Sequence, residues 1–419
     1  MTEREKYQDY LRQLNAPFEK LVRLRFLQPD GSTAFSVDNN TRNRYGAAFI
    51  QEGTLTVNLQ NGQRRAATIT MAGVTDRFDY DVNHLWFGTE VALDEGLTLS
   101  DGSPYYIQQG IFLLETPTEA LTPQGRTVRY TLSDKWAMLD GRLGGNLEGS
   151  YEVPRGTNIF TPIVSLLSED RGNGYPIDNV TPIFTEYYNG KTQALTDGTT
   201  AALVNSPYTL TVSGEGGTKA TIILDLASMV NAWVGYDRTG ALRLDPSQDD
   251  ILDNTKPIQW RFDMAGDRTL LSLNYTMKNT EVYNDYIVMG QQLDDYRQPN
   301  GRAQNLDPTS DTNVNLIGRK TFRETKAGYA TDTMCQDYAM WKLKRVTALQ
   351  KSVSISCSQI LHIEENNLVT VRRADKPGSP VERHLVMGFS RPLAQTGAMT
   401  IQAVSVTDYP IATLSSWPD

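Results

Sequence analysis

Pairs of neighbouring acidic residues are the first candidates for chemistry in this sequence, which holds 49 aspartates and glutamates among 419 residues. Asp294-Asp295, Asp249-Asp250 and Glu364-Glu365 are such pairs, and so is Asp94-Glu95. A glycosidase needs two carboxylates about 5–10 Å apart in a cleft. Charged residues are mostly exposed without a special role, and Asp94-Glu95 and Asp249-Asp250 stand near predicted turns. We therefore expect solvated carboxylates here rather than a catalytic pair.

Histidines and cysteines are too few and too scattered to predict a reactive site. His84, His362 and His384 show no metal-ligand spacing. Cys335 and Cys357 fit neither a disulfide framework nor a zinc motif, so we expect two buried thiols. The sequence also lacks a Gly-x-Ser-x-Gly elbow, a phosphate loop and a Cys-His-Asn signature. We expect no catalytic residues, no metal site and no cofactor.

Six tryptophans offer a different kind of site, an aromatic platform that binds sugars. All but the last stand in or beside segments predicted to be strand or helix, which favours packing in the core. They are Trp86, Trp136, Trp233, Trp260, Trp341 and Trp417.

Composition narrows the class of protein. Hydrophobic residues make up 39% and charged residues 21%, which is typical of a globular chain, and the length predicts several domains. A net charge of −9 argues against a nucleic-acid-binding protein, which needs a basic surface. No apolar run reaches the ~18 residues of a membrane span, and the N-terminus lacks the apolar core of a signal peptide. We expect a protein made in a cytoplasm, with no membrane-spanning segment.

The part of the chain before residue 146 contains a predicted helix followed by a predicted series of strands. Residues 3–14 carry Tyr7, Tyr10, Leu11 and Leu14 at helical spacing, which predicts an amphipathic helix that docks on a partner or on its own chain. From residue 21 the apolar period becomes two, with turn signals at short intervals. Asn61-Gly62, between two strand-like segments, predicts a β-hairpin. The pattern predicts an antiparallel barrel or sandwich over residues 20–145.

The middle of the chain has a mixed pattern. Gly141 to Gly156 is rich in glycine and predicts a linker. Helices are expected at 159–167 and 220–233, the second capped by Thr218 and including Trp233. A hairpin is expected at 236–244. These features predict a smaller α+β insertion at residues 146–256.

Strands return in the last third, at 260–264, 271–277 and 282–289. Residues 291–313, with Asp294, Asp295 and Arg302, contain little apolar content and predict a loop that is mobile or is ordered only against a partner. Thr331 is expected to cap a helix over 331–350, and four more strands follow. The predicted fold class is mainly β, with two antiparallel barrel-like domains bracketing the insertion. The predicted domains are a helical arm at 1–19, β domains at 20–145 and 257–412, the insertion between them, and a tail at 413–419.

The order of these pieces resembles the tail hub, or baseplate hub, proteins of bacteriophages. The first tube domain of that family is similar to the stretches Leu85-Trp-Phe-Gly-Thr-Glu-Val91, Gly110-Ile-Phe-Leu-Leu114 and Tyr130-Thr-Leu-Ser-Asp-Lys-Trp136. The hairpin Tyr236-Asp-Arg-Thr-Gly-Ala-Leu-Arg-Leu244 resembles the end of the family's insertion. The second tube domain is similar to Val282-Tyr-Asn-Asp-Tyr-Ile-Val-Met-Gly290, then Gly318-Arg-Lys-Thr-Phe322 and the helix carrying Ala339 and Leu343.

The resemblance implies a structural protein without enzymatic activity. Three copies of such a hub form a homotrimeric, pseudo-hexameric ring at the tail tip of the virion, assembled in the cytoplasm of the host bacterium. The ring joins the hexameric tail tube protein and the distal tail protein to the threefold tip. Further implied partners are the tape measure protein and the tip fibre or spike proteins, and DNA passes through the lumen. The peptidase or glycan-hydrolase domain that many relatives carry is not expected here.

Interfaces are therefore expected in place of a reactive site. The candidate partner contacts are Tyr7, Tyr10 and Leu11 on the first helix, and Asp294, Asp295 and Arg302 in the polar loop. Two alternatives stay open. The aromatic residues allow a carbohydrate- or receptor-binding tail module, and the acidic pairs allow a cell-wall hydrolase.

Overall fold

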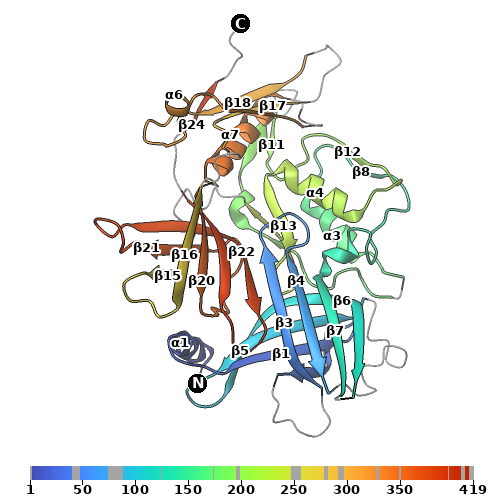
Figure 1. The fold of residues 1–419 in the computed structure, drawn as a ribbon. Helices are drawn as coiled ribbons and strands as arrows, with labels where there is room; N and C mark the ends of the chain where they lie inside the picture. Colours follow the sequence, from blue (N-terminus) through green and yellow to red (C-terminus); the bar gives the residue numbers. More distant parts are fainter. Residues whose placement is uncertain are drawn as a thin grey trace.

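The computed structural model describes residues 2–39, 48–73, 88–123, 125–172, 174–194, 199–246, 256–277, 282–290, 297–326, 329, 331–348, 351–394, 396–406 and 411–414. Within them, a 13-stranded sheet dominates the molecule, and a mixed α/β part and a smaller four-stranded sheet lie beside it (Figure 1). The predicted fold class, mainly β with an α+β insertion, is confirmed. The predicted domain limits themselves stay a prediction.

The first β half follows the predicted period of two. In β1 and β4, buried and partly buried residues alternate, which places one face of each strand in the core. The Asn61-Gly62 hairpin is confirmed, because β3 and β4 pair antiparallel on either side of it. The elements are β1 (Lys20–Leu27), β2 (Thr33–Asp38), β3 (Phe49–Asn58), β4 (Arg65–Ala72), β5 (Glu90–Thr98), β6 (Pro104–Thr122), β7 (Gly125–Asp134) and the 3-10 helix η2 (Lys135–Met138).

Among the described strands, one pair joins the second β half to the first. β22 runs antiparallel to β3, with Gly388 opposite Asn58 and Pro392 opposite Thr54, so both halves share one continuous sheet. β15 and β21 pair in parallel, which departs from the antiparallel pattern expected. The strands are β15 (Ile258–Asp263), β16 (Leu270–Met277), β20 (Lys351–Cys357), β21 (Leu368–Arg372), β22 (Val381–Pro392) and β23 (Met399–Ser405).

One hydrophobic core is shared by both halves and by the N-terminal helix. It contains Phe26 and Phe112 from the first half and Val353 and Ile401 from the second. Helix α1 (Glu3–Gln13) begins with a capping box between Thr2 and Glu5. Of the two docking modes expected for this helix, the structure has it packed on its own chain.

The insertion packs around a second hydrophobic cluster, which also contains Leu113 of β6 and Trp136 of η2. Its second helix is capped by the Thr218 hydroxyl, as predicted. The expectation that this helix reaches Trp233 is wrong. Asn231 has a φ of 52°, a left-handed conformation that ends helices, and Trp233 lies in the next strand. The elements are β8 (Tyr151–Val153), α3 (Phe160–Ser168), β9 (Ile183–Phe184), η3 (Glu186–Tyr188), β10 (Thr192–Ala194), β11 (Thr200–Ala202), β12 (Leu210–Val212), α4 (Lys219–Met229), β13 (Ala232–Tyr236) and β14 (Leu242–Pro246).

The remaining elements form a four-stranded sheet in the order β19-β17-β18-β24, with a helix on one face. The prediction of a loop throughout 291–313 is wrong in part. β18 lies between two strands and under that helix, so its polar residues become buried. The elements are β17 (Asp285–Met289), β18 (Asn300–Asn305), α6 (Val314–Ile317), β19 (Thr321–Thr325), α7 (Asp332–Ala348) and β24 (Ile411–Leu414). No helix in the described ranges has the length and apolarity to cross a membrane.

Candidate functional site

Two adjacent arginines at the start of β4 form the centre of the candidate site. The hairpin before them docks on the insertion, because the Asn61 side chain accepts a hydrogen bond from the Val234 amide at 2.9 Å. The carboxylate of Asp134 accepts hydrogen bonds from the amides of Arg64 (2.8 Å) and Arg65 (2.9 Å). These contacts fix the backbone from which both guanidinium groups project.

The two guanidinium groups connect three parts of the chain. Arg65 Nη2 lies 2.6 Å from Glu365 Oε2 and 3.1 Å from Glu364 Oε1, in the second β half. Arg64 Nη1 lies 3.7 Å from Glu365 Oε1 and 4.0 Å from Asp245 Oδ2, in the insertion. Arg64, Arg65 and Glu365 are at most 3% exposed at their side chains. We call the cluster of Arg64, Arg65, Asp245, Glu364 and Glu365 the charged junction.

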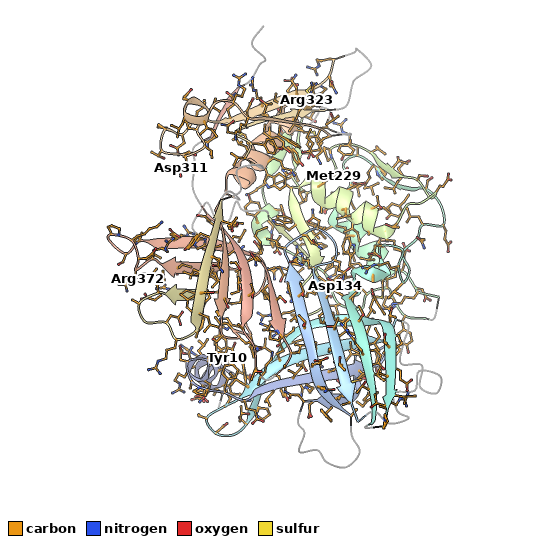
Figure 2. The ribbon with its side chains drawn as sticks, viewed as in Figure 1. Tyr10, Asp134, Met229, Asp311, Arg323 and Arg372 are labelled. Atoms are coloured by element: carbon orange, nitrogen blue, oxygen red, sulfur yellow. The ribbon has the colours of Figure 1, made fainter. Side chains whose placement is uncertain are left out.

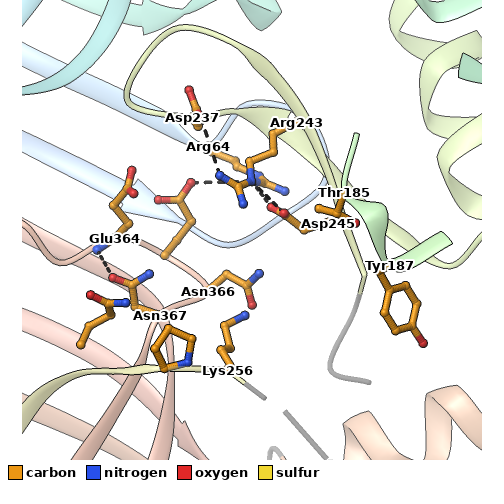
Figure 3. A pocket seen from close by; sticks show the side chains of 13 residues that line it. Arg64, Thr185, Tyr187, Asp237, Arg243, Asp245, Lys256, Glu364, Asn366 and Asn367 are labelled. Carbon is orange, nitrogen blue, oxygen red and sulfur yellow. Dashed lines mark hydrogen bonds and ion pairs between the residues drawn. The ribbon is translucent and has the colours of Figure 1, made fainter. Parts of the chain in front are cut away.

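A cavity of 340 Å³ opens beside the charged junction. Figure 3 shows Asp245 beside both Arg64 and Arg243, and Arg243 Nε donates to Asp245 at 2.7 Å. Lys256 and Asn366 line the far wall. Every carboxylate lining this cavity lies within 4.0 Å of an arginine, so the acids act as partners of cations.

Burial and ion pairing oppose each other in the charged junction. Burial alone would lower the pKa of Arg65, but the Glu365 and Glu364 carboxylates raise it above its ordinary value. For Arg64 burial dominates and lowers the pKa, because its carboxylates are farther away. Burial also raises the pKa of Glu364, although Arg65 and Arg238 favour its charged form. The cluster is stable only while its charges stay paired.

A second buried network joins the same two β halves. Glu95, fully buried, lies 2.6 Å from Lys20 Nζ and 2.5 Å from Arg391 Nη2. Arg391 Nη2 also donates to Gln109 Oε1 at 2.7 Å, while Arg65 Nη1 donates to the Gln109 carbonyl at 2.9 Å. Gln109 therefore links the second network to the charged junction. Burial opposes the charge of Glu95, but Arg391 and Lys20 outweigh it and lower the pKa of Glu95.

The predicted acidic pairs have different fates. The prediction that Asp94-Glu95 is solvated is wrong: Asp94 is 2% exposed and bonds to Arg25 Nε at 2.7 Å. Glu364-Glu365 belongs to the charged junction. Asp249-Asp250 and Asp294-Asp295 lie outside the described residues. The arginines that neutralise the buried acids were missed. Adjacent charges at the start of an alternating strand were a usable signal, because the two side chains must point to opposite faces.

The predicted partner contacts lie in two regions. On α1, Tyr10 is fully buried, and its hydroxyl lies 3.0 Å from His362 Nδ1 and accepts from the Leu361 amide at 3.1 Å. Tyr7 and Leu11 are partly buried beside it. Arg302 is 7% exposed, and its guanidinium donates to both carboxylate oxygens of Asp285 at 2.8 Å. Contacts of these residues with a partner stay predictions.

Other candidate residues lie mostly in the interior. Cys335 and Cys357 are buried free thiols, as predicted. Trp136 and Trp233 are 4% exposed and pack in hydrophobic clusters, which confirms core packing for both. Trp260 and Trp341 pack against clusters as partly buried residues, while Trp86 and Trp417 lie outside the described ranges. Among the described residues, no three histidine, cysteine or acidic side chains are grouped to hold a metal ion.

Solved structures share this arrangement over nearly the whole chain. The 43 kDa tail protein of prophage MuSo2 from Shewanella oneidensis matches with a TM-score of 0.58 and 11% identity, over 92% of this chain and 98% of that one. A tail protein from Neisseria meningitidis MC58 matches with a TM-score of 0.57 and 10% identity, over 92% and 96%. The half-lidded Francisella PdpA-VgrG complex matches with a TM-score of 0.51 and 9% identity, over 99% and 62%.

Sequence comparisons identify no related protein or family. No protein-family model and no curated protein matches this chain. At identities near 10%, the structural likenesses show the fold alone. That fold is the one implied by the resemblance of the sequence pattern, which is thereby confirmed.

Proposed function

We propose that this chain, which has the fold of phage tail proteins, is a structural protein in the tail of a phage or of a prophage-derived particle. The observation that carries the proposal is the shared sheet of the two β halves. Strand β22 pairs with β3, and buried ion pairs link the same halves through Arg65 and Arg391. One chain thus supplies two rigidly joined β units, and three chains supply six.

A homotrimeric ring is the finer form of this proposal. The main path of the large sheet runs from β16 to β2, with β15 as the end of a side branch through β21, and β16 and β2 each pair with one other strand among the described residues. On β16, Leu271 is 62% and Tyr275 37% exposed. An exposed apolar edge strand is a template for pairing with another chain. Pairing of β16 with β2 of the next copy is a head-to-tail contact, which closes into a ring if the rotation fits.

In this proposal the ring joins the tail tube and distal tail proteins to the tip, with the tape measure and fibre or spike proteins as neighbours and DNA in transit. The net charge of −9 suits a lumen that does not bind DNA, because like charges repel. The exposed side of α1 near Tyr7 and Leu11, and the segment with Asp294 and Asp295, are proposed contacts with these proteins. We propose no catalytic role, since the acids beside the cavity are held as partners of arginines.

Sedimentation velocity with electron microscopy of the purified chain tests the ring. We expect particles of three times the chain mass with a central opening. Leu271→Lys places a charge on the exposed edge and should give monomers. Leu121→Lys is the matched control, because Leu121 is 76% exposed in β6, away from both sheet ends, and should leave the trimer intact. A wild-type chain that stays monomeric at high concentration contradicts the proposal, as does a trimer insensitive to Leu271→Lys.

A further inference from the structure

A short segment at one end of the molecule presents apolar and basic side chains together. It comprises α6, the turn after it and the first three residues of β19, residues 314–323, and we call it the basic segment. Helix α6 buries none of its four residues: Leu316 is 69% exposed and Ile317 39%. Figure 2 shows Arg323 at the end of the molecule opposite Tyr10. These two neighbouring side chains form a small apolar surface beside basic residues, and apolar surface rimmed by polar groups is typical of interaction sites.

One fully buried asparagine, Asn284, anchors the basic segment, and a second, Asn305, orders the turn that precedes it. The Asn284 side chain donates to the carbonyls of Thr312 (3.0 Å) and Gly318 (2.8 Å) and accepts from the Lys320 amide (2.8 Å). The Asn305 side chain donates to the hydroxyl of Ser310 at 2.8 Å. Because these bonds already order the backbone, a partner that binds here loses little free energy to ordering.

The charge of the basic segment is opposite to that of the whole chain. Arg319, Lys320 and Arg323 are exposed within it, whereas the chain carries a net charge of −9. Arg319 Nε lies 3.7 Å from Asp285 Oδ2, but that carboxylate already accepts two bonds from Arg302. The described residues place no carboxylate within ion-pair distance of Lys320 or Arg323, so two cations are available to a ligand.

The backbone of β19 offers a second set of contacts. In the described part of the chain, β19 pairs with β17 alone and forms the edge of its sheet. Its side chains alternate, with Phe322 packed on Tyr286 (ring centroids 5.1 Å apart) and Arg323 exposed on the opposite face. An extended peptide can add to such an edge through main-chain hydrogen bonds, while its side chains decide specificity.

From this combination we propose that the basic segment docks an extended segment of another protein in which acidic and aliphatic residues alternate. The carboxylates of that segment pair with Lys320 and Arg323, and its aliphatic side chains cover Leu316 and Ile317. The inference rests on this surface alone and does not require the ring. A second copy of this chain and an anionic membrane are the competing occupants, and the test separates them.

Fluorescence anisotropy with a labelled peptide of alternating glutamate and leucine tests the docking. We expect saturable binding to the full chain that weakens as NaCl rises from about 0.05 to about 0.5 M, because salt screens exposed charges. Lys320→Glu with Arg323→Glu should weaken binding by about 10-fold or more, since reversal replaces attraction by repulsion. Leu316→Ser with Ile317→Ser should weaken it several-fold through the apolar contacts.

Matched controls keep the test falsifiable. Arg129→Glu with Arg268→Glu reverses two exposed cations elsewhere and should leave affinity unchanged. A peptide with lysine in place of glutamate should not bind. Equal affinity of the wild type and the Lys320/Arg323 variant overturns the proposal. The proposal is also contradicted if the peptide does not bind and vesicles containing phosphatidylglycerol capture the wild type. It is likewise contradicted if the peptide does not bind and the wild type self-associates in a way that the Lys320/Arg323 variant abolishes. Circular dichroism verifies that each variant is folded.

Discussion

Glu365 is the carboxylate on which the charged junction depends most, and Glu365→Gln is the change that tests it. The substitution keeps the shape of the side chain and one acceptor oxygen but removes the charge. Arg65 Nη2 then loses its partner at 2.6 Å, and Arg64 Nη1 loses its nearer partner at 3.7 Å. Both guanidinium groups are at most 2% exposed, so water cannot replace the lost charge.

The size of the loss follows from what remains. At an effective dielectric constant of about 20, two unit charges 2.6 Å apart attract by about 6 kcal/mol. The net loss of stability is smaller, because Glu364 stays 3.1 Å from Arg65 and Asp245 stays 4.0 Å from Arg64, so each guanidinium keeps one carboxylate nearby. Removing one partner of a buried pair costs about 3–5 kcal/mol in general. We therefore expect the free energy of unfolding to fall by about 3 kcal/mol.

Urea unfolding at pH 7, followed in parallel by tryptophan fluorescence and far-UV circular dichroism, measures this loss. Coincidence of the two transitions tests whether a single free energy applies. Asp263→Asn is the matched control, because Asp263 forms an exposed ion pair with Arg372 at 3.0 Å. The Arg372 side chain is 50% exposed and the Asp263 side chain 35%. An exposed pair contributes less than about 1 kcal/mol. If both variants lose the same amount, the charged junction does not stabilise the fold as argued.

Two further perturbations test the buried histidines and the hairpin. Burial lowers the pKa of His362 and of His384 to about 4, from 6.5, so the unfolded chain binds protons more tightly. The free energy of unfolding is therefore highest above pH 6.5 and falls as the pH drops towards 4, by up to about 3 kcal/mol per histidine. Urea midpoints that do not change between pH 7 and pH 4.5 would refute this reasoning. At the hairpin, Gly62→Ala should cost more than Gly102→Ala. Both positions have positive φ, but a Cβ at Gly62 lies 3.2 Å from Trp136 Nε1, whereas one at Gly102 has nothing within 4 Å. Equal shifts in midpoint temperature would show that the contact with Trp136 has no effect.

Features set by a few neighbouring residues were predictable from the sequence. The Asn61-Gly62 hairpin formed as expected, because the dipeptide itself favours the tight turn. Thr218 caps α4, and Thr331 accepts from the Met334 amide at the start of α7. The period-two segments became strands. In each case the residues that determine the local structure lie within a few positions of one another in the sequence.

Features that depend on distant partners were not predictable in the same way. Arg65 and Glu365 are 300 residues apart in sequence, and nothing near either residue indicates the other. Asp94 was expected in solvent, but Arg25 and Arg23 of β1 meet it when β1 pairs with β5. Residues 301–305 of β18 were predicted to be a loop because most of their side chains are polar. They form a buried strand because neighbouring strands and helix α7 cover them.

The sequence by itself determined most of the β-strands of the two halves, the helix caps and the order of these elements, since backbone preference and apolar period act over a few residues. Only the tertiary structure decided which charges are buried and which strand joins the two β halves. The reason is physical: the free energy of an ion pair or a strand pair depends on the partner that folding brings near. That partner lies 69 residues away for Arg25 and Asp94 and 300 residues away for Arg65 and Glu365.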